Sequence, residues 1–100
     1  MSISGIELKD AVAQRVTVGD EALIVDLSDA RTITVPLAWF PRLVFGTPEE
    51  RANWRLIGRG AGIHWPDLDE DISVESLLAG RRSAETQASL RRWLQSREAF

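Results

Sequence analysis

Residues 12–35, VAQRVTVGDEALIVDLSDARTITV, contain three short segments in which apolar side chains alternate with polar ones. Alternation with a period of two residues is typical of β-strands that bury one face. Gly19-Asp20 separates the first two segments, and at the second turn Asp29 can hydrogen-bond its own backbone. The stretch therefore predicts an antiparallel three-stranded meander. The side chains expected on one face of its first strand are those of Val12, Gln14, Val16 and Val18.

Short helices and one more strand are predicted after the meander. Pro36 ends the third strand because proline has no N–H to donate to a sheet. One helix is expected from near Ala38 to Gly46, and another begins at Thr47, where the sequence Thr-Pro-Glu-Glu provides a capping box. Residues 56–65 carry glycine at three alternate positions. They predict a fourth strand with one bare face, which the ring of Trp39 or Trp54 covers.

The last third of the chain predicts two helices. Ser73 is expected to cap a helix over residues 74–79, which Gly80 ends. Ser83 is expected to cap a final helix whose apolar residues fall on one face. The predicted fold is therefore α+β: a β-meander and a fourth strand packed against short helices in a single small domain. Residues 1–80 form its core, and residues 81–100 form a C-terminal amphipathic helix that packs on the core or extends from it.

Composition excludes several classes of protein. The 100 residues include no cysteine, so disulfide frameworks and thiolate metal sites are absent. No apolar run approaches the ~20 residues that cross a bilayer, and residues 1–10 lack the pattern of a signal peptide. The expected location is the cytoplasm. The net charge of −3 argues against a surface that is electropositive everywhere.

The segment from Gly60 to Gly80 holds the only histidine, His64, and the densest group of carboxylates. A calcium loop of the EF-hand type fails here, because its required glycine falls on Ile72 and its bidentate glutamate on Leu78. A metal-dependent or acid–base enzyme centred on His64 remains an alternative, which a His64→Ala variant tests. The favoured interpretation is that His64 is a partly buried hydrogen-bonding residue. In that interpretation Trp65 and the other tryptophans are packing residues, the acids face water, and no metal or cofactor is expected.

Several motifs occur downstream of the meander in a distinctive order. They are VPLAWFPRL (35–43), ERANW (50–54), GAGIHWP (60–66), LDEDISV (68–74) and LLAG (77–80). Over about residues 12–80, the chain resembles the small bacterial proteins grouped as domain of unknown function 2442. The resemblance implies a compact α+β fold and no particular reaction. Some relatives carry a helix-turn-helix DNA-binding domain after this module, for which the twenty residues after Gly80 are too few. Others are encoded beside a small partner in suspected toxin–antitoxin pairs.

The leading functional hypothesis is a non-catalytic module that binds a protein partner. Its acidic face would meet a basic partner, and exposed Trp39 or Phe40 would anchor the contact. The residues of the acidic face are Asp67, Asp69, Glu70 and Asp71. The resemblance adds that the partner is the product of a neighbouring gene, with this chain as the antitoxin-like or regulatory member of a two-protein operon.

Direct binding of nucleic acid is the second hypothesis. Arginines are concentrated towards the C-terminus, and such charge asymmetry can mark a surface that faces nucleic acid. They are Arg81, Arg82, Arg91, Arg92 and Arg97. The alternative is a solvated amphipathic helix whose arginines pair with the acidic block. A gel shift at low salt, on duplex or single strand, separates the two.

Overall fold

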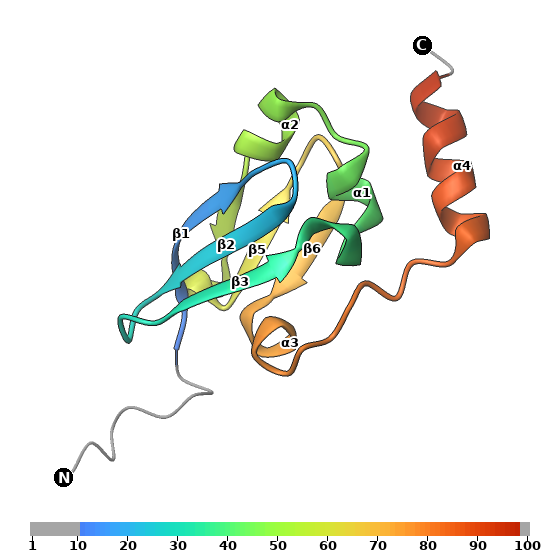
Figure 1. The fold of residues 1–100 in the computed structure, drawn as a ribbon. Helices are drawn as coiled ribbons and strands as arrows, with labels where there is room; N and C mark the ends of the chain where they lie inside the picture. Colours follow the sequence, from blue (N-terminus) through green and yellow to red (C-terminus); the bar gives the residue numbers. More distant parts are fainter. Residues whose placement is uncertain (1–10, 99–100) are drawn as a thin grey trace, which may run out of the picture.

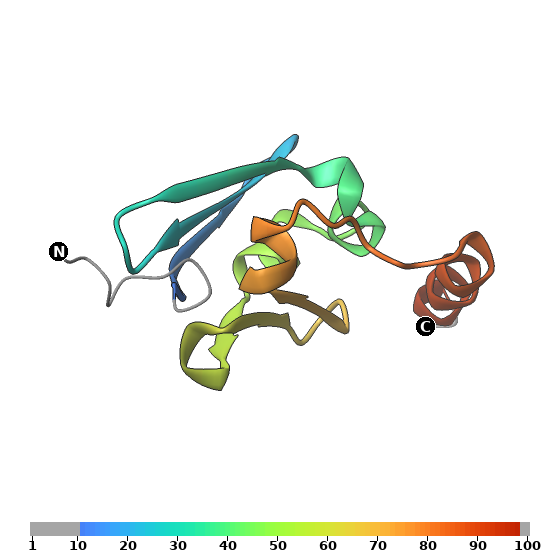
Figure 2. The same ribbon diagram turned by 90° about the horizontal axis from the view of Figure 1, so that it is seen from below.

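The fold contains two antiparallel three-stranded sheets, seen in a computed structural model that describes residues 11–98. The first sheet consists of β1 (Ala13–Val18), β2 (Ala22–Leu27) and β3 (Thr32–Pro36), in that order. The second consists of β4 (Arg55–Ile57), β5 (Gly62–Trp65) and β6 (Glu70–Ser73), again in chain order. The two sheets form separate layers (Figures 1 and 2). The arrangement confirms the predicted α+β class.

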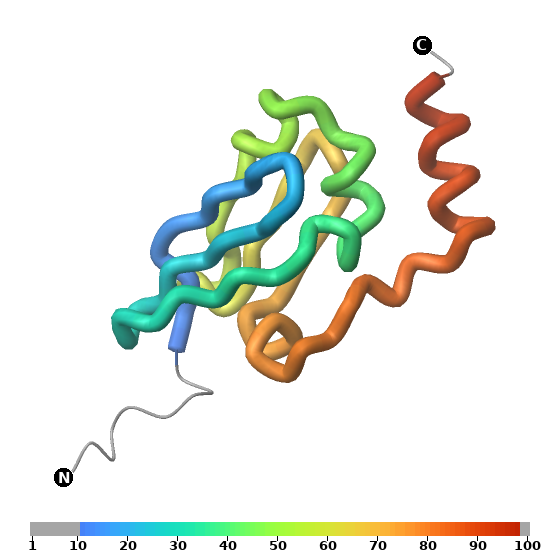
Figure 3. Tube along the Cα trace, in the orientation of Figure 1, coloured from blue at the N-terminus to red at the C-terminus, as the bar shows by residue number. Residues whose placement is uncertain are grey.

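Short helices connect and flank the sheets. They are the 3₁₀ turns η3 (Leu37–Trp39) and η4 (Gly58–Gly60) and the helices α1 (Pro41–Val44), α2 (Pro48–Ala52), α3 (Val74–Leu78) and α4 (Gln87–Glu98). Of these, α4 stands apart from the two sheets, at the end of an extended connection (Figures 1 and 3). We call this connection, residues 81–86, the strap. Within residues 11–98, no helix has the length and apolar character needed to cross a membrane.

The predicted meander is confirmed, but one face of its first strand was predicted wrongly. The register of the β1–β2 pair shifts between Ala13 and Arg15, as it does at a β-bulge. The extra residue moves Ala13 to the buried side together with Val16, whereas Gln14 is exposed. At the β2–β3 turn, the Asp29 carboxylate accepts a hydrogen bond of 3.1 Å from the Arg31 N–H, as the sequence predicts.

The predicted single strand over residues 56–65 is wrong. The segment is a hairpin, in which β4 and β5 are joined by η4. Gly58 and Gly60 adopt φ angles of +57° and +92°, so they form the turn instead of baring one face of a strand. No tryptophan covers Gly60; a side chain there would meet the backbone of Ala13. The sequence predicts no strand at β6, whose last residue, Ser73, is expected only as the cap of the following helix.

Two of the predicted caps are confirmed. The Thr47 hydroxyl accepts from the Glu50 N–H at 3.1 Å, and the Glu50 carboxylate accepts from the Thr47 N–H at 2.9 Å, which completes the capping box. The Ser73 hydroxyl accepts from the Ser76 N–H at 3.0 Å and caps α3. These caps satisfy N–H groups that the first turn of a helix leaves without partners.

Two other helix predictions need correction. The helix expected from Ala38 to Gly46 is divided into η3 and α1, because Phe40 has non-helical angles of φ −129° and ψ 87° between them. Ser83 does not cap the last helix, which begins at Gln87. Instead, the Thr86 hydroxyl accepts from the Ser89 N–H at 3.0 Å.

The core lies between the two sheets and is closed by the short helices. Fully buried side chains come from the inner faces of both sheets, from η3 and α1, and from α3. They include Leu23, Val25, Leu27, Leu37, Leu43, Ile63, Trp65, Leu68 and Val74. Trp65 is the last residue of β5, the middle strand of the second sheet, and its indole N–H donates a 3.0 Å hydrogen bond to the Arg51 carbonyl. The inward packing predicted for Trp65 and Leu68 is confirmed.

Candidate functional site

The four predicted acidic residues do not converge on one point. Asp67 accepts a 2.9 Å hydrogen bond from the Asn53 side chain, and Asp71 contacts His64. Asp69 lies 3.4 Å from an Arg42 nitrogen, with its side chain 86% exposed. Since these carboxylates face three different partners, they do not form a shared ligand set. Among residues 11–98, no group of three or more acidic or histidine side chains is placed to hold a metal ion.

His64 belongs to a pair across two strands. It lies on β5 opposite Asp71 on β6, and its Nδ1 atom contacts the Asp71 carboxylate. The His64 side chain is 31% exposed, so the predicted partly buried, hydrogen-bonding histidine is confirmed. Cross-strand pairs of this kind support a sheet. Of the four predicted acids, Asp71 is the one that the structure brings to His64.

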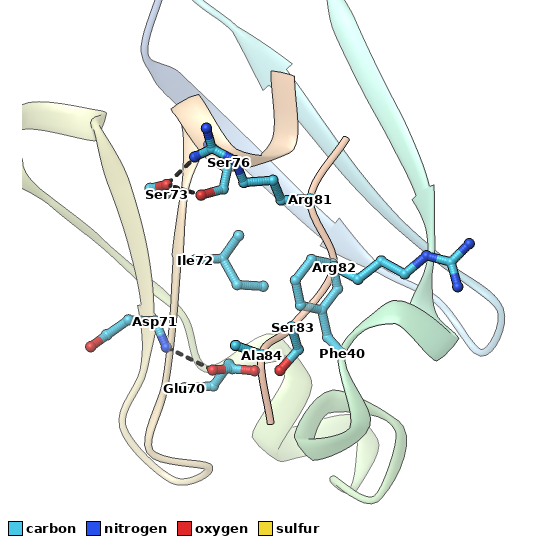
Figure 4. A pocket seen from close by; sticks show the side chains of 10 residues that line it. All are labelled: Phe40, Glu70, Asp71, Ile72, Ser73, Ser76, Arg81, Arg82, Ser83 and Ala84. Atoms are coloured by element: carbon cyan, nitrogen blue, oxygen red, sulfur yellow. Dashed lines mark hydrogen bonds between the residues drawn. The ribbon is translucent and has the colours of Figure 1, made fainter. Parts of the chain in front are cut away.

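A pocket of about 330 Å³ opens between β6 and the strap. One wall is the whole of β6, and the other is formed by residues 81–84 of the strap. Ile72 and Phe40 provide apolar surface between these walls (Figure 4). This volume falls within the range of about 300–1,000 Å³ that is usual for ligand pockets. The pocket is therefore bordered by the strand β6, by the apolar residues Phe40 and Ile72, and by polar groups of the strap.

The charges in the pocket are separated. Glu70 lies at one end, and Arg81 lies towards the other end, near Ser73 and Ser76, whereas the Asp71 carboxylate points away from the pocket and contacts His64 (Figure 4). Glu70 turns back on its own strand, where its Oε1 atom accepts a 3.1 Å hydrogen bond from the Asp71 N–H. Burial raises the pKa of Glu70, although that hydrogen bond and the charge of Arg42 oppose the change. The pocket thus has an acidic end and a basic end.

Neither aromatic residue proposed as an anchor is freely exposed. Phe40 is only 4% exposed, so its prediction as an exposed anchor is wrong. Its backbone turn between η3 and α1 directs the ring into the core, where one side borders the pocket. Trp39 is half-buried, and the Arg82 guanidinium lies 5.1 Å from the centroid of its ring. Such cation–π contacts cover aromatic surface that would otherwise meet water.

The C-terminal arginines are divided among different roles. Arg81 lines the pocket, and Arg82 stacks on Trp39. Arg97 donates to the Glu50 carboxylate at 2.8 Å and lies 3.4 Å from the Asp67 carbonyl oxygen. The remaining two, Arg91 and Arg92, are exposed on α4. A uniform nucleic-acid surface made by all five is therefore less favoured, since Arg97 is used to link α4 to Glu50 of α2.

Sequence reasoning missed the cluster that attaches the strap and α4. Arg42 on α1 forms an ion pair with Glu85 of the strap, with 2.6 Å between the Arg42 Nε and Glu85 Oε1 atoms. This hydrogen bond is the main cause that raises the pKa of Arg42 and lowers that of Glu85. Both Arg42 and Arg97 also place their guanidinium groups over the ring of Trp93. The only sequence signal was the amphipathic pattern of the last helix.

Comparison with known proteins gives the family. A family model described as a protein of unknown function, DUF2442, matches residues 13–83. The chain belongs to this family. The match includes both sheets, α3 and most of the pocket, and it ends before α4. Among curated proteins, none matches the chain.

Two solved structures of similar fold support the architecture. A crystal structure of a protein of unknown function from Rhodospirillum rubrum is 27% identical, with a TM-score of 0.66. The alignment covers 79% of this chain and 95% of that one. A solution structure of an uncharacterized protein from Chromobacterium violaceum is 23% identical, with a TM-score of 0.63. That alignment covers 73% of this chain and 69% of the other. The second likeness concerns the fold alone.

Proposed function

We propose that this DUF2442 chain is a non-catalytic protein-binding domain, and that its contact surface is the pocket with its acidic end. The observation that carries the proposal is the pocket of about 330 Å³ that lies directly along a strand edge. The largely buried Phe40 and Ile72 line the pocket between its charged ends, which are formed by Glu70 and Arg81. Binding surfaces typically join apolar anchoring area with a polar rim.

The arrangement of the titratable groups supports binding more than catalysis. An acid–base site needs a base, a partner that orients it and a position for the reacting atom. Here His64 and Asp71 form a cross-strand pair, and Asp67 and Asp69 contact other residues. The exposed carboxylates of Asp67, Asp69 and Asp71 are suited to attracting a basic protein. Such electrostatic attraction raises the association rate more than the affinity.

The partner proposed is the product of a neighbouring gene. The resemblance to relatives encoded in suspected toxin–antitoxin pairs supports an antitoxin-like or regulatory role in a two-protein operon. Co-expression of the two genes, with a tag on one product, tests this directly. A stable complex that survives gel filtration is the expected result, and separate elution of the two products contradicts the proposal.

Charge reversal tests the acidic face, of which Glu70 lines the pocket and Asp69 lies outside it. In the double variant Asp69→Lys/Glu70→Lys, the association rate with the co-purified partner should fall, and the fall should be larger at low salt than at high salt. The matched control is Glu21→Lys/Glu98→Lys, which changes the net charge equally at two exposed positions outside the pocket. An association rate that both double variants lower equally would show general electrostatics and not this surface.

A further inference from the structure

β6 forms an edge of its sheet. Among the described residues it pairs only with β5, and its other side borders the pocket. The strap lies across the pocket but does not extend the sheet. Its backbone N–H groups at Arg81 and Ser83 donate to the carbonyls of Ser76 and Trp39, not to β6. The pocket therefore lies between the edge of β6 and the strap, which these two hydrogen bonds hold in place.

The edge of β6 presents a backbone donor to the pocket. The Asp71 N–H donates to the Glu70 side chain on the side of β6 that faces the pocket (Figure 4). In an antiparallel ladder, residues alternate between those that bond one neighbouring strand and those that bond the other. The Asp71 N–H is thus directed to the outer side of β6. The Glu70 carboxylate occupies the position that the carbonyl oxygen of an added strand would take.

An unprotected strand edge is a template for another strand. Proteins that bind peptides by strand addition use such edges, with main-chain hydrogen bonds for affinity and side-chain pockets for specificity. A carboxylate that turns back on the edge protects it reversibly, since an incoming carbonyl can replace one Glu70 oxygen. The released carboxylate is then free to meet a basic side chain of the peptide.

We infer that the edge of β6 binds an extended peptide segment as an added strand, with a lysine or arginine beside Glu70 and a carboxylate beside Arg81. The separated charges of the pocket select this occupant, because a peptide with both charges complements both ends. Ile72 and Phe40, each 4% exposed, line the space between these ends. This inference rests on the proposed function and names the partner's recognised segment.

Five-residue peptides test the inference. Ac-Lys-Thr-Val-Thr-Glu-NH2 and Ac-Glu-Thr-Val-Thr-Lys-NH2 carry the two charges in the two possible strand directions. We expect one of them to shift the backbone amide signals of residues 70–73 saturably in a ¹⁵N NMR titration and to slow hydrogen exchange at Asp71. The same peptide with an N-methylated central valine keeps both charges but hinders strand pairing. It should bind about tenfold more weakly, the equivalent of one hydrogen bond.

Two variants of Asp71 separate the contribution of its backbone N–H to peptide binding from that of its carboxylate. Asp71→Pro removes the N–H that faces the pocket, whereas Asp71→Asn keeps that N–H and equally removes the carboxylate beside His64. Peptide binding should be lost in Asp71→Pro and kept in Asp71→Asn, with near-ultraviolet circular dichroism confirming the fold of both. If Asp71→Pro does not fold, the N-methylated peptide still decides between strand addition and charge recognition.

Four results would overturn the inference. Equal binding of the N-methylated peptide would show that charges alone are recognised. Unchanged signals from β6 with both peptides would show that the edge is not a binding site. A concentration-dependent dimer that Asp71→Pro abolishes would assign the edge to a second copy of this chain. If a partner protein co-purifies while Asp71→Pro leaves its affinity unchanged, strand addition fails and the proposed function stands.

Discussion

The Glu85 carboxylate receives two hydrogen bonds from the Arg42 guanidinium, from Nε at 2.6 Å and from Nη2 at 3.1 Å. The two side chains are only 8% and 16% exposed, so the pair is largely removed from water. The Arg42 guanidinium also lies 5.1 Å from the ring centroid of Trp93, on α4. The Arg42–Glu85 ion pair attaches the strap to α1. The contact between Arg42 and Trp93 attaches α4 to α1 as well.

Removing the charge of Glu85 should destabilise the protein. In Glu85→Gln, the Arg42 guanidinium keeps its charge but loses its closer anionic partner, in a site with little water, and retains only the contact with the exposed Asp69 carboxylate. We expect the free energy of unfolding to fall by about 1–3 kcal/mol, as measured by urea denaturation followed through tryptophan fluorescence. The control is Glu98→Gln, an exposed residue on α4, which should change it by less than about 0.5 kcal/mol. Equal effects of the two variants would mean that the ion pair does not stabilise the fold.

The attachment of α4 should weaken in acid. Hydrogen bonds from Arg42 and Arg97 are the main causes that lower the pKa values of Glu85 and Glu50 below the ordinary 4.5. A carboxylate with a lower pKa in the folded chain than in the unfolded chain stabilises the fold above its ordinary value. That contribution is lost as the pH falls through the folded-state pKa. The indole NMR signal of Trp93 should therefore move towards its unfolded position below pH 4.5, and less pH dependence is expected in Glu85→Gln/Glu50→Gln.

Local patterns predicted the meander and the capped helices because each depends on a few neighbouring residues. The alternation of residues 23–27 identifies β2, and the capping box from Thr47 to Glu50 identifies the start of α2. β6 carries no such signal, because it has four residues, of which two are acidic. Its strand structure comes from pairing with β5 and not from its own propensity.

The candidate site could not be predicted because it is built by contacts between distant positions. Arg42 and Glu85 are separated by 43 positions, and Glu50 and Arg97 by 47. The pocket likewise requires the strap to lie opposite β6, which no local pattern encodes. The acidic residues were identified correctly as a cluster in sequence, but tertiary structure decides that Glu70 enters the pocket while Asp69 remains exposed.

Two glycines with positive φ angles offer a matched test of the fold. Gly80 has a φ of +73° and open space around it, so Gly80→Ala should cost about 1–2 kcal/mol of stability through backbone strain alone. Gly60 has a φ of +92°, and an added Cβ would lie 2.7 Å from the Ala13 carbonyl oxygen and 3.0 Å from the Val12 Cβ atom. Gly60→Ala should therefore cost about 1–3 kcal/mol more than Gly80→Ala. Urea denaturation of both variants measures the difference, and equal losses would show that η4 does not pack against β1 in this way.

Replacing the Glu70 carboxylate by an amide, in Glu70→Gln, should increase the free energy of unfolding at neutral pH. Burial raises its pKa in the folded chain, so ionisation destabilises the fold at neutral pH, and this effect disappears as the pH falls below the ordinary value of 4.5. Glu70→Gln keeps an oxygen that can accept from the Asp71 N–H. The variant should therefore be more stable at neutral pH, by less than about 1 kcal/mol because the side chain is partly solvated.

That gain in Glu70→Gln should vanish near pH 4, where the wild-type carboxyl is itself protonated. Urea denaturation at both pH values measures it. Asp69→Asn, at a side chain that is 86% exposed, is the control and should show no comparable gain. A gain in Glu70→Gln that does not depend on pH would arise from packing and not from the buried charge. A loss of stability at neutral pH would mean that the carboxylate holds the edge of β6 more strongly than an amide can, and the edge would then be closed to an added strand.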